Sequence, residues 1–281
     1  MRMQVLGLCR FSYLGGRGFQ SAPEDREARR AYLYDPDRLA RRWYWFENVT
    51  LPALRAQTDP DFTLVVMTGP DLPEPWLGRL RALEDEIPQL RLSLIRPMNY
   101  HLAACDHALR PFRADNVDVV AHFRMDDDDA VAVDFIERVR ADFPLVEAAC
   151  ASHDGAAIDY MRGLVLRASR TGLKVTPRIL HFASAGLVVY LPPEDMRSAV
   201  HLPHWCIAEH MPVLGLADAP MFCRLLNHDN DSGEEGPGHD WDLPADALHA
   251  LMWKRFRLRR GALNRDAKAG LAMGAAAGTD V

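Results

Sequence analysis

Four consecutive carboxylates, Asp126 to Asp129, stand in the middle of this 281-residue chain. They follow an apolar run over residues 117–125, which is rich in Val, suits a buried strand and is too short for an ordinary helix. Adjacent acids repel one another at pH 7 and need a compensating cation, and carboxylate oxygens suit Mg²⁺ and Mn²⁺. We hypothesise that two of these acids hold a metal that in turn holds a phosphate. The alternative is an acidic, solvated turn.

The spacing of the acids leaves two possible metal-binding pairs. Side chains alternate between the two faces of a strand, so Asp126 would pair with Asp128, and Asp127 with Asp129. An acid cluster at one strand end also needs a further ligand. His228 is the candidate, because it lies in a polar turn after a late apolar segment and His is a common ligand of such ions. The alternative for His228 is an ordinary surface histidine.

The first half of the chain alternates strands and helices, which is typical of a parallel α/β sheet. We expect strands at residues 4–9, 62–68, 90–95 and 117–125, and helices at residues 37–55, 76–83 and 102–110. Ligands bind beyond the carboxyl ends of such strands. The acids, Arg10 and Arg96 should therefore meet at one edge of the sheet.

The second half mixes short elements. We expect a helix at residues 133–143, strands at 146–150 and 182–191, and a hairpin of strands 163–168 and 174–180. A short helix at 204–211 and a longer one at 244–260 follow. The Ala- and Gly-rich end, residues 270–281, is expected to be disordered.

Composition limits the possible partners and location. The net charge of −6 argues against nucleic acid as a main partner. Five widely spaced cysteines without a CxxC pair indicate free thiols in a reducing cytoplasm. The start of the chain does not read as a signal peptide, and there is no apolar stretch of 18 residues, so we expect a cytoplasmic protein without a membrane span.

Several segments together resemble a known group of enzymes. They are Arg10-Phe11-Ser12, Thr50 to Leu54, Asp61-Phe62, Phe123 to Asp129, Ser184-Ala185-Gly186 and His228-Asp229-Asn230. Over residues 3–233 the sequence is similar to glycosyltransferases of the GT-A type, and more narrowly to a bacterial family of putative rhamnosyltransferases. The resemblance implies one α/β domain, with a mixed sheet flanked by helices, that binds a nucleotide-sugar through a DxD motif and Mn²⁺ or Mg²⁺.

The resemblance also implies roles for individual residues. It favours the first and third acids, Asp126 and Asp128, as metal ligands. Asp129 and His228 are the further expected ligands. Contacts to the nucleotide-sugar would come from Arg10, Phe11, Ser12, Arg96, Arg124, Asp126 and Asp127. The general base of an inverting enzyme falls at Glu209, with His210 as second choice and Asp154 and Asp159 as further possibilities. The related enzymes carry two carboxylates at this place, and His210 departs from that pattern. Trp205 is expected either to stack on a sugar or to lie in the core.

The function implied is transfer of a sugar, rhamnose by the family's name, from a UDP-, GDP- or dTDP-sugar to a glycan or other hydroxyl acceptor. Residues 1–130 would form the nucleotide-binding half of a domain spanning 1–233, and residues 131–233 the acceptor half. A C-terminal loop and helix would occupy residues 234–269. One rival is a phosphohydrolase of the haloacid-dehalogenase type, with Asp127 as nucleophile and Lys174 as its lysine. The other is a metal- or nucleotide-sugar-binding module without turnover.

Overall fold

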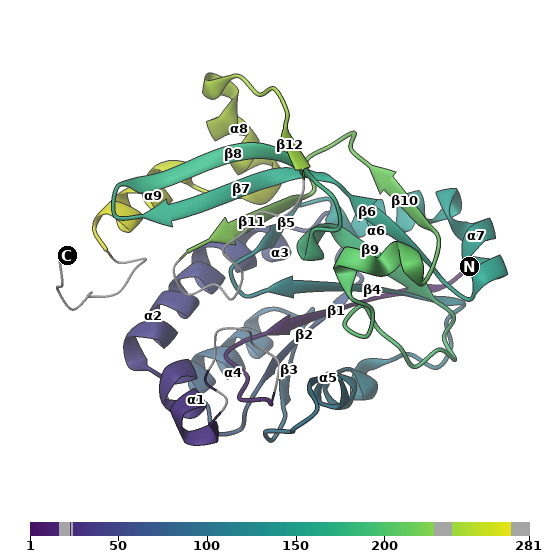
Figure 1. Cartoon of the computed structure of the whole chain (residues 1–281), viewed down its shortest axis with the longest axis horizontal. Coiled ribbons are helices and arrows are strands. Elements are labelled where there is room, and N and C mark those ends of the chain that lie inside the picture. Colours follow the sequence, from purple (N-terminus) through teal and green to yellow (C-terminus); the bar gives the residue numbers. More distant parts are fainter. Residues whose placement is uncertain (17–22, 24, 228–237, 271–281) are drawn as a thin grey trace.

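A central sheet of seven strands organises the structure, a computed structural model that describes residues 1–16, 23, 25–227 and 238–270 (Figure 1). The strand order is β10-β6-β9-β4-β1-β2-β3, and β9 alone among them runs antiparallel to its neighbours. The strands are β1 (Met3–Arg10), β2 (Thr63–Thr68), β3 (Leu90–Leu94), β4 (Val119–Asp126), β6 (Ala156–Tyr160), β9 (Leu187–Leu191) and β10 (Val213–Leu216). The predicted mixed sheet is confirmed, and so are the four N-terminal strands.

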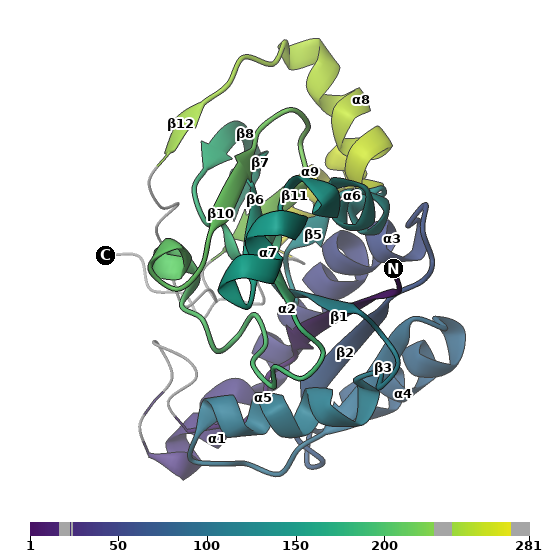
Figure 2. The ribbon, with the colours of Figure 1, turned by 90° about the vertical axis from the view of Figure 1, so that its right-hand side faces the viewer.

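Helices cover both faces of the central sheet, which explains the continuous apolar runs of its strands (Figure 2). Leu6 and Leu8 of β1 pack with the α5 residues Ala104 and Ala108, whereas Val5 belongs to the core on the opposite face. The helices are α1 (Arg26–Leu33), α2 (Pro36–Trp45), α3 (Leu51–Arg55), α4 (Trp76–Glu86), α5 (His101–Leu109), α6 (Phe135–Asp142), α7 (Glu147–His153), α8 (Ala245–Phe256) and α9 (Arg260–Lys268). None of these helices is long and apolar enough to cross a bilayer, a statement that covers the described residues.

Helix α2 begins at a strong start signal. The Asp35 carboxylate accepts a hydrogen bond from the Arg38 backbone N–H at 2.8 Å, and Pro36 occupies the first turn. The helix continues through a π-helical turn at Phe46–Thr50 into α3, so the helix expected at residues 37–55 is present. The buried face of α2 points toward the end of β4, so Arg42 can reach the acids there.

A second sheet lies over the end of β4 (Figure 1). Its order is β12-β8-β7-β11-β5. The strands are β5 (Ala130–Val131), β7 (Arg162–Ser169), β8 (Gly172–Leu180), β11 (Phe222–Leu226) and β12 (Gly238–Asp240). The β7–β8 hairpin confirms the one expected from the sequence. Because β5 follows the four acids at once, the acidic turn is the point where the chain passes from the first sheet to the second.

Three expected elements differ from the structure. Residues 146–150 were expected as a strand, but the Ala-rich segment from Glu147 forms α7, in keeping with its helix propensity. The strand expected at 182–191 is shorter, since residues 184–186 form a 3₁₀ turn before β9. The helix expected at 244–260 is divided into α8 and α9, because Arg257 adopts a left-handed conformation with φ of 57°. The tail expected to be disordered lies, from residue 271, outside the described residues.

Candidate active site

The acidic turn begins where β4 ends, at Asp126. The Asp129 backbone N–H donates to the Asp126 carbonyl at 3.2 Å and closes the turn. The chain turns at Asp126, so strand alternation does not describe the acids that follow it, and which acids pair stays a prediction. The side chains of Asp127, Asp128 and Asp129 are buried, whereas that of Asp126 is half exposed.

Arg42 of α2 supplies positive charge to two of the buried acids. Its Nε donates to Asp127 Oδ2 at 3.1 Å, and its Nη1 donates to Asp128 Oδ2 at 3.0 Å. Arg42 Nη2 also contacts Asp127 Oδ1. A guanidinium fork fits carboxylates in this way. Part of the compensating charge that the acids need thus comes from the chain itself.

Asp129 joins the turn to the second sheet. Its Oδ1 accepts from the Leu225 backbone N–H at 3.2 Å, and its carbonyl accepts from Thr50 Oγ1 at 2.8 Å. Burial raises the pKa of Asp129 well above its usual range, and the charges of Asp128 and Asp126 raise it further. The surroundings of Asp129 therefore favour its neutral form, and its contacts connect β11 to the end of β4.

Asp126 lies between arginines. Arg10, its partner in the β1–β4 register, places Nη2 3.4 Å from Asp126 Oδ1. Desolvation opposes the charge of Asp126, but the positive charges of Arg10, Arg124 and Arg42 outweigh it and lower the pKa of this carboxyl. Asp126 is therefore ionised, and half of its side chain is accessible to a ligand.

Arg124 is a second cation at this edge. Burial lowers the pKa of its guanidinium, and the neighbouring charge of Asp126 partly restores it. Within the described part of the chain, this guanidinium takes part in no hydrogen bond or ion pair. A desolvated cation without a carboxylate partner is suited to bind an anion.

The end of β11 reaches the acids as well. Asn227 Nδ2 donates to Asp128 Oδ2 at 3.0 Å. His228, the next residue and the expected metal ligand, lies outside the described residues. Among residues 1–16, 23, 25–227 and 238–270, no group of three His, Cys, Asp or Glu side chains is placed to hold a metal.

The segment after β1 is more buried than the sequence suggested. The Phe11 side chain is fully buried and packs against Trp43 and Phe46, so it belongs to the core. Ser12 is buried too, and its Oγ accepts from Arg38 Nη1 at 3.1 Å.

Arg96 stands apart from this buried segment. Its side chain is exposed, and its carbonyl accepts a hydrogen bond from Tyr13 at 3.0 Å.

The four residues expected as possible general bases lie in different environments. Glu209 and His210 are exposed at the end of a 3₁₀ helix, His204–Glu209. Asp154 precedes β6 and so lies at the amino edge of the sheet, away from the acids. Asp159 lies near the carboxyl end of β6, is buried, and accepts the Phe182 backbone N–H on Oδ2 at 2.8 Å. Burial raises its pKa to about 7.

The sequence profile of the family described as "Putative rhamnosyl transferase" matches residues 4–239 of this chain. The chain belongs to this family. It is a family of glycosyltransferases, so the match favours sugar transfer over the rival phosphohydrolase function. Lys174, which that function needs, is exposed on the β7–β8 hairpin.

Comparison with other proteins adds little beyond the family. No curated protein matches the chain. The crystal structure of S. aureus TarS 1-349 shares 12% identity, covering 80% of this chain and 60% of that one, with a TM-score of 0.40. Its complex with UDP shares 13% identity over 80% and 61%, with a TM-score of 0.38. A Bacillus anthracis structure named as a glucose-1-phosphate thymidylyltransferase shares 8% identity over 76% and 87%, with a TM-score of 0.31. The chain thus spans about 60% of the TarS structure, and TM-scores this low carry no argument.

Two residues that were not expected from the sequence contact the acidic turn: Arg42 and Asn227. Arg42 carried a usable signal, because Arg38 and Arg42 recur at helical spacing among the apolar residues of α2. A charged side chain on a buried helix face requires a partner. Asn227 carried no such signal.

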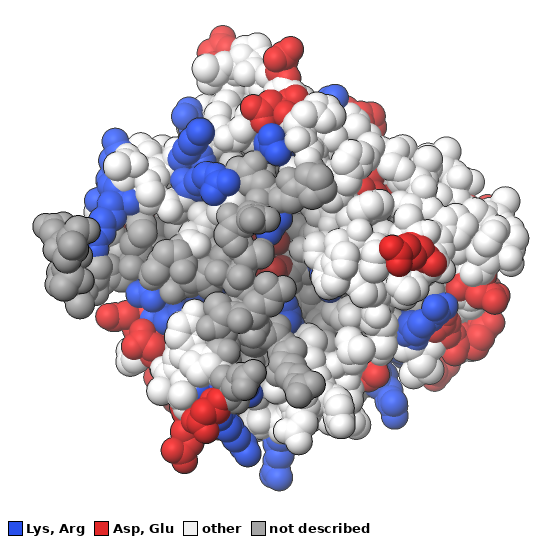
Figure 3. All heavy atoms as spheres, viewed as in Figure 1, with Lys and Arg blue, Asp and Glu red and all other residues white. Residues whose placement is uncertain are grey.

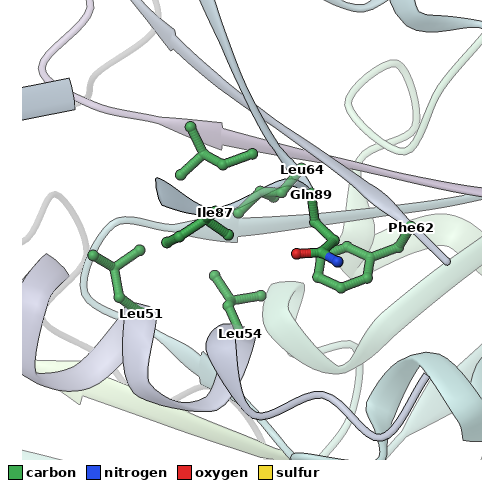
Figure 4. Close-up of a pocket in the computed structure, with 7 residues that line it drawn as sticks. Leu51, Leu54, Phe62, Leu64, Ile87 and Gln89 are labelled. Carbon is green, nitrogen blue, oxygen red and sulfur yellow. The ribbon is translucent and has the colours of Figure 1, made fainter. Parts of the chain in front are cut away.

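Charge gathers where these elements meet. Figure 3 shows acidic and basic atoms side by side in the middle of the face where Figure 1 places the end of β4. A separate small pocket lies between α3 and the strands β2 and β3 (Figure 4). Its lining is apolar apart from Gln89, so it offers nothing to a nucleotide diphosphate. The lining residues are Leu51, Leu54, Phe62, Leu64, Ile87, Gln89 and Leu90.

Proposed function

We propose that this protein transfers a sugar, rhamnose being the one that the family's description suggests, from a nucleotide-sugar to a hydroxyl of a glycan acceptor. The observation that carries the proposal is that an ionised, half-exposed carboxylate, Asp126, lies two residues after Arg124 at the carboxyl edge of the parallel strands, and that the Arg124 guanidinium has no hydrogen-bond or ion-pair partner among the described residues. Ligand sites of α/β sheets lie at that edge. The leaving group of the transfer is a nucleoside diphosphate, whose negative charge must be neutralised. Cations at this edge of the sheet can supply that neutralisation.

We also propose a divalent cation, Mn²⁺ or Mg²⁺, as part of this site. Asp126 has accessible carboxylate oxygen, Asp128 lies next to it, and Asn227 brings the chain to Asp128 immediately before His228. Asp126, Asp128 and His228 would hold the ion, with Arg42 neutralising the remaining acid charge. The bound ion would supply Lewis-acid neutralisation of the diphosphate. Because the described acids do not form a three-ligand cluster, we expect the phosphates of the donor to complete the coordination.

Calorimetry with UDP, GDP and dTDP, each with Mn²⁺ and with a chelator, tests both parts. We expect one nucleotide to bind, and Mn²⁺ to tighten its binding by at least about tenfold, equivalent to about 1.4 kcal/mol. Asp126→Asn and Asp128→Asn, which preserve the side-chain shape and remove the charge, should lose the Mn²⁺ effect. Asp115→Asn, at an exposed position, is the matched control.

The results separate the alternatives. Equal Mn²⁺ dependence in the parent and both site variants would disprove the metal assignment. Absence of binding for all three nucleotides would disprove the donor site. Tight binding of a nucleotide-sugar without any release of nucleoside diphosphate, even with glycan acceptors, would indicate a binding module in place of a transferase.

A further inference from the structure

His204 is held in one tautomer at the rim of the acidic turn. Its Nδ1 lies 2.5 Å from the Phe182 carbonyl oxygen. A carbonyl can only accept, so Nδ1 carries the proton and Nε2 presents a lone pair. Burial and, to a smaller extent, the charge of Arg124 lower the pKa of His204 to about 4, so the ring is neutral at pH 7. No group in the described part of the chain hydrogen-bonds Nε2.

The carbonyl that fixes His204 is itself fixed. Phe182 adopts a left-handed conformation with φ of 57°, which is rare for a bulky residue and persists only when its surroundings hold it. Its N–H donates to Asp159 Oδ2 at 2.8 Å, while its carbonyl accepts from His204. The buried Asp159 therefore orients the peptide that orients the histidine.

Sheet register places this arrangement beside the donor site. Asp159 of β6 is opposite Leu187 of β9, and Val188 of β9 is opposite Phe123 of β4. Arg124 follows Phe123, so Asp159 and Arg124 lie in one row across the sheet. Two strand spacings, about 10 Å, separate them.

The pKa of His204 responds to charges at the end of β4 and on β11. The charged groups that act on it are Arg124 and Asp126 of β4 and Arg224 of β11. Since both strands end at the acidic turn, the histidine is close to the place proposed for the diphosphate.

An exposed aromatic side chain adjoins the histidine. Trp205 has 68% of its surface exposed, and its ring stands edge-on to that of His204, with centroids 5.3 Å apart and planes at 77°. An exposed indole face suits the apolar face of a sugar ring. Glu209 has no comparable constraint, because it is exposed and donates or accepts no side-chain hydrogen bond among the described residues.

We propose that His204 is the general base of the transfer, with Nε2 taking the proton of the acceptor hydroxyl and Trp205 carrying the acceptor sugar. This inference rests on the proposed function. The acceptor oxygen bonds to the anomeric carbon as the bond from that carbon to the phosphate oxygen breaks, and the electron pair leaves with the nucleoside diphosphate. Asp159 touches no substrate in this scheme and acts as a positioning residue.

Two experiments test the assignment. The first is the ¹H–¹⁵N long-range NMR spectrum of the parent protein at pH 7, with the His204→Asn spectrum identifying the signal. We expect the neutral tautomer with the proton on Nδ1. A proton on Nε2, or a doubly protonated ring, would overturn the proposal whether or not a donor is known.

The second experiment measures release of nucleoside diphosphate from dTDP-rhamnose, UDP-glucose and GDP-mannose, with water as acceptor. The Asn amide of His204→Asn can still donate to Phe182 but cannot replace Nε2. We expect kcat to fall by about 100-fold or more, nucleoside diphosphate affinity to stay within about twofold, and the acid limb of the pH profile to disappear. His107→Asn, at an exposed position on α5, should keep the parent rate.

Failure of the inference is distinguishable from failure of the proposed function. A parent that binds no nucleotide disproves the function. A His204→Asn variant that keeps the parent kcat, or a Glu209→Gln variant that alone loses it, disproves the role of His204 while leaving the donor site intact.

Discussion

Arg42 Nη1 lies 3.0 Å from Asp128 Oδ2, and both side chains are almost completely buried. The two residues are 86 positions apart in the chain, and α2 and the end of β4 bring them together. Arg42 therefore supplies part of the positive charge that the acidic turn needs. Its fixed guanidinium offsets part of the negative charge of the turn, and Asp126 is the most exposed of the four acids.

Removing this guanidinium should destabilise the fold. In Arg42→Met the side chain keeps its length but leaves Asp127 and Asp128 as buried, uncompensated charges. We expect the free energy of unfolding to fall by about 3–5 kcal/mol, measured by urea denaturation. Arg170→Met, at the exposed hairpin turn, serves as control and should change it by less than about 0.5 kcal/mol. A loss below about 1 kcal/mol in Arg42→Met would mean that the acids are neutralised in another way.

Arg124 should contribute to diphosphate binding and to little else. Its guanidinium has no partner to lose within the described residues, so Arg124→Met should leave folding stability nearly unchanged. We expect the affinity for the nucleoside diphosphate to fall by about 10- to 100-fold, the value of one charge-assisted hydrogen bond. The affinity for the corresponding nucleoside, measured by the same calorimetry, should not change. Equal losses for both ligands would place Arg124 away from the phosphates.

The sequence predicted those features of the site that depend on local pattern. An apolar run that ends in acids identifies a strand and its ligand edge, because strand period and edge position are local properties. The position of Arg10 beside Asp126 followed from the same reasoning, since both end neighbouring parallel strands.

The features that depend on distant contacts could not be predicted. The tautomer of His204 depends on the backbone of Phe182, 22 residues earlier in the chain. The direction of each acid depends on the turn closed by Asp129, which strand alternation does not describe. The prediction of a strand at residues 146–150 was wrong for a different reason, because a short apolar run fits a strand and a buried helix equally well.

Close packing between β1 and β4 positions the end of β4, and Gly7 makes it possible. A Cβ atom at Gly7 would lie 2.2 Å from Phe123 Cζ in the neighbouring strand. Gly7→Ala should therefore lower the free energy of unfolding by about 1–3 kcal/mol through overpacking. Gly261→Ala is a useful contrast, because its Cβ would meet nothing closer than 3.8 Å on α9. That variant should be neutral or stabilising by up to about 1 kcal/mol, and the opposite order of the two variants in thermal unfolding would contradict the packing argument.

Asp159 makes the stability of the fold depend on pH. Burial raises its pKa from 3.8 to about 7, so the folded state holds the proton more tightly than the unfolded chain does. Its contribution to stability is complete below pH 3.8 and is lost as the pH rises to about 7, at a cost of at most about 4 kcal/mol. Asp159→Asn does not titrate and still accepts the Phe182 N–H. We therefore expect this variant to unfold at a higher urea concentration than the parent at pH 8, with the difference shrinking steadily toward pH 5, while the exposed Asp115→Asn shows no such trend. A difference that stays constant between pH 5 and 8 would mean that Asp159 is already ionised in the folded protein.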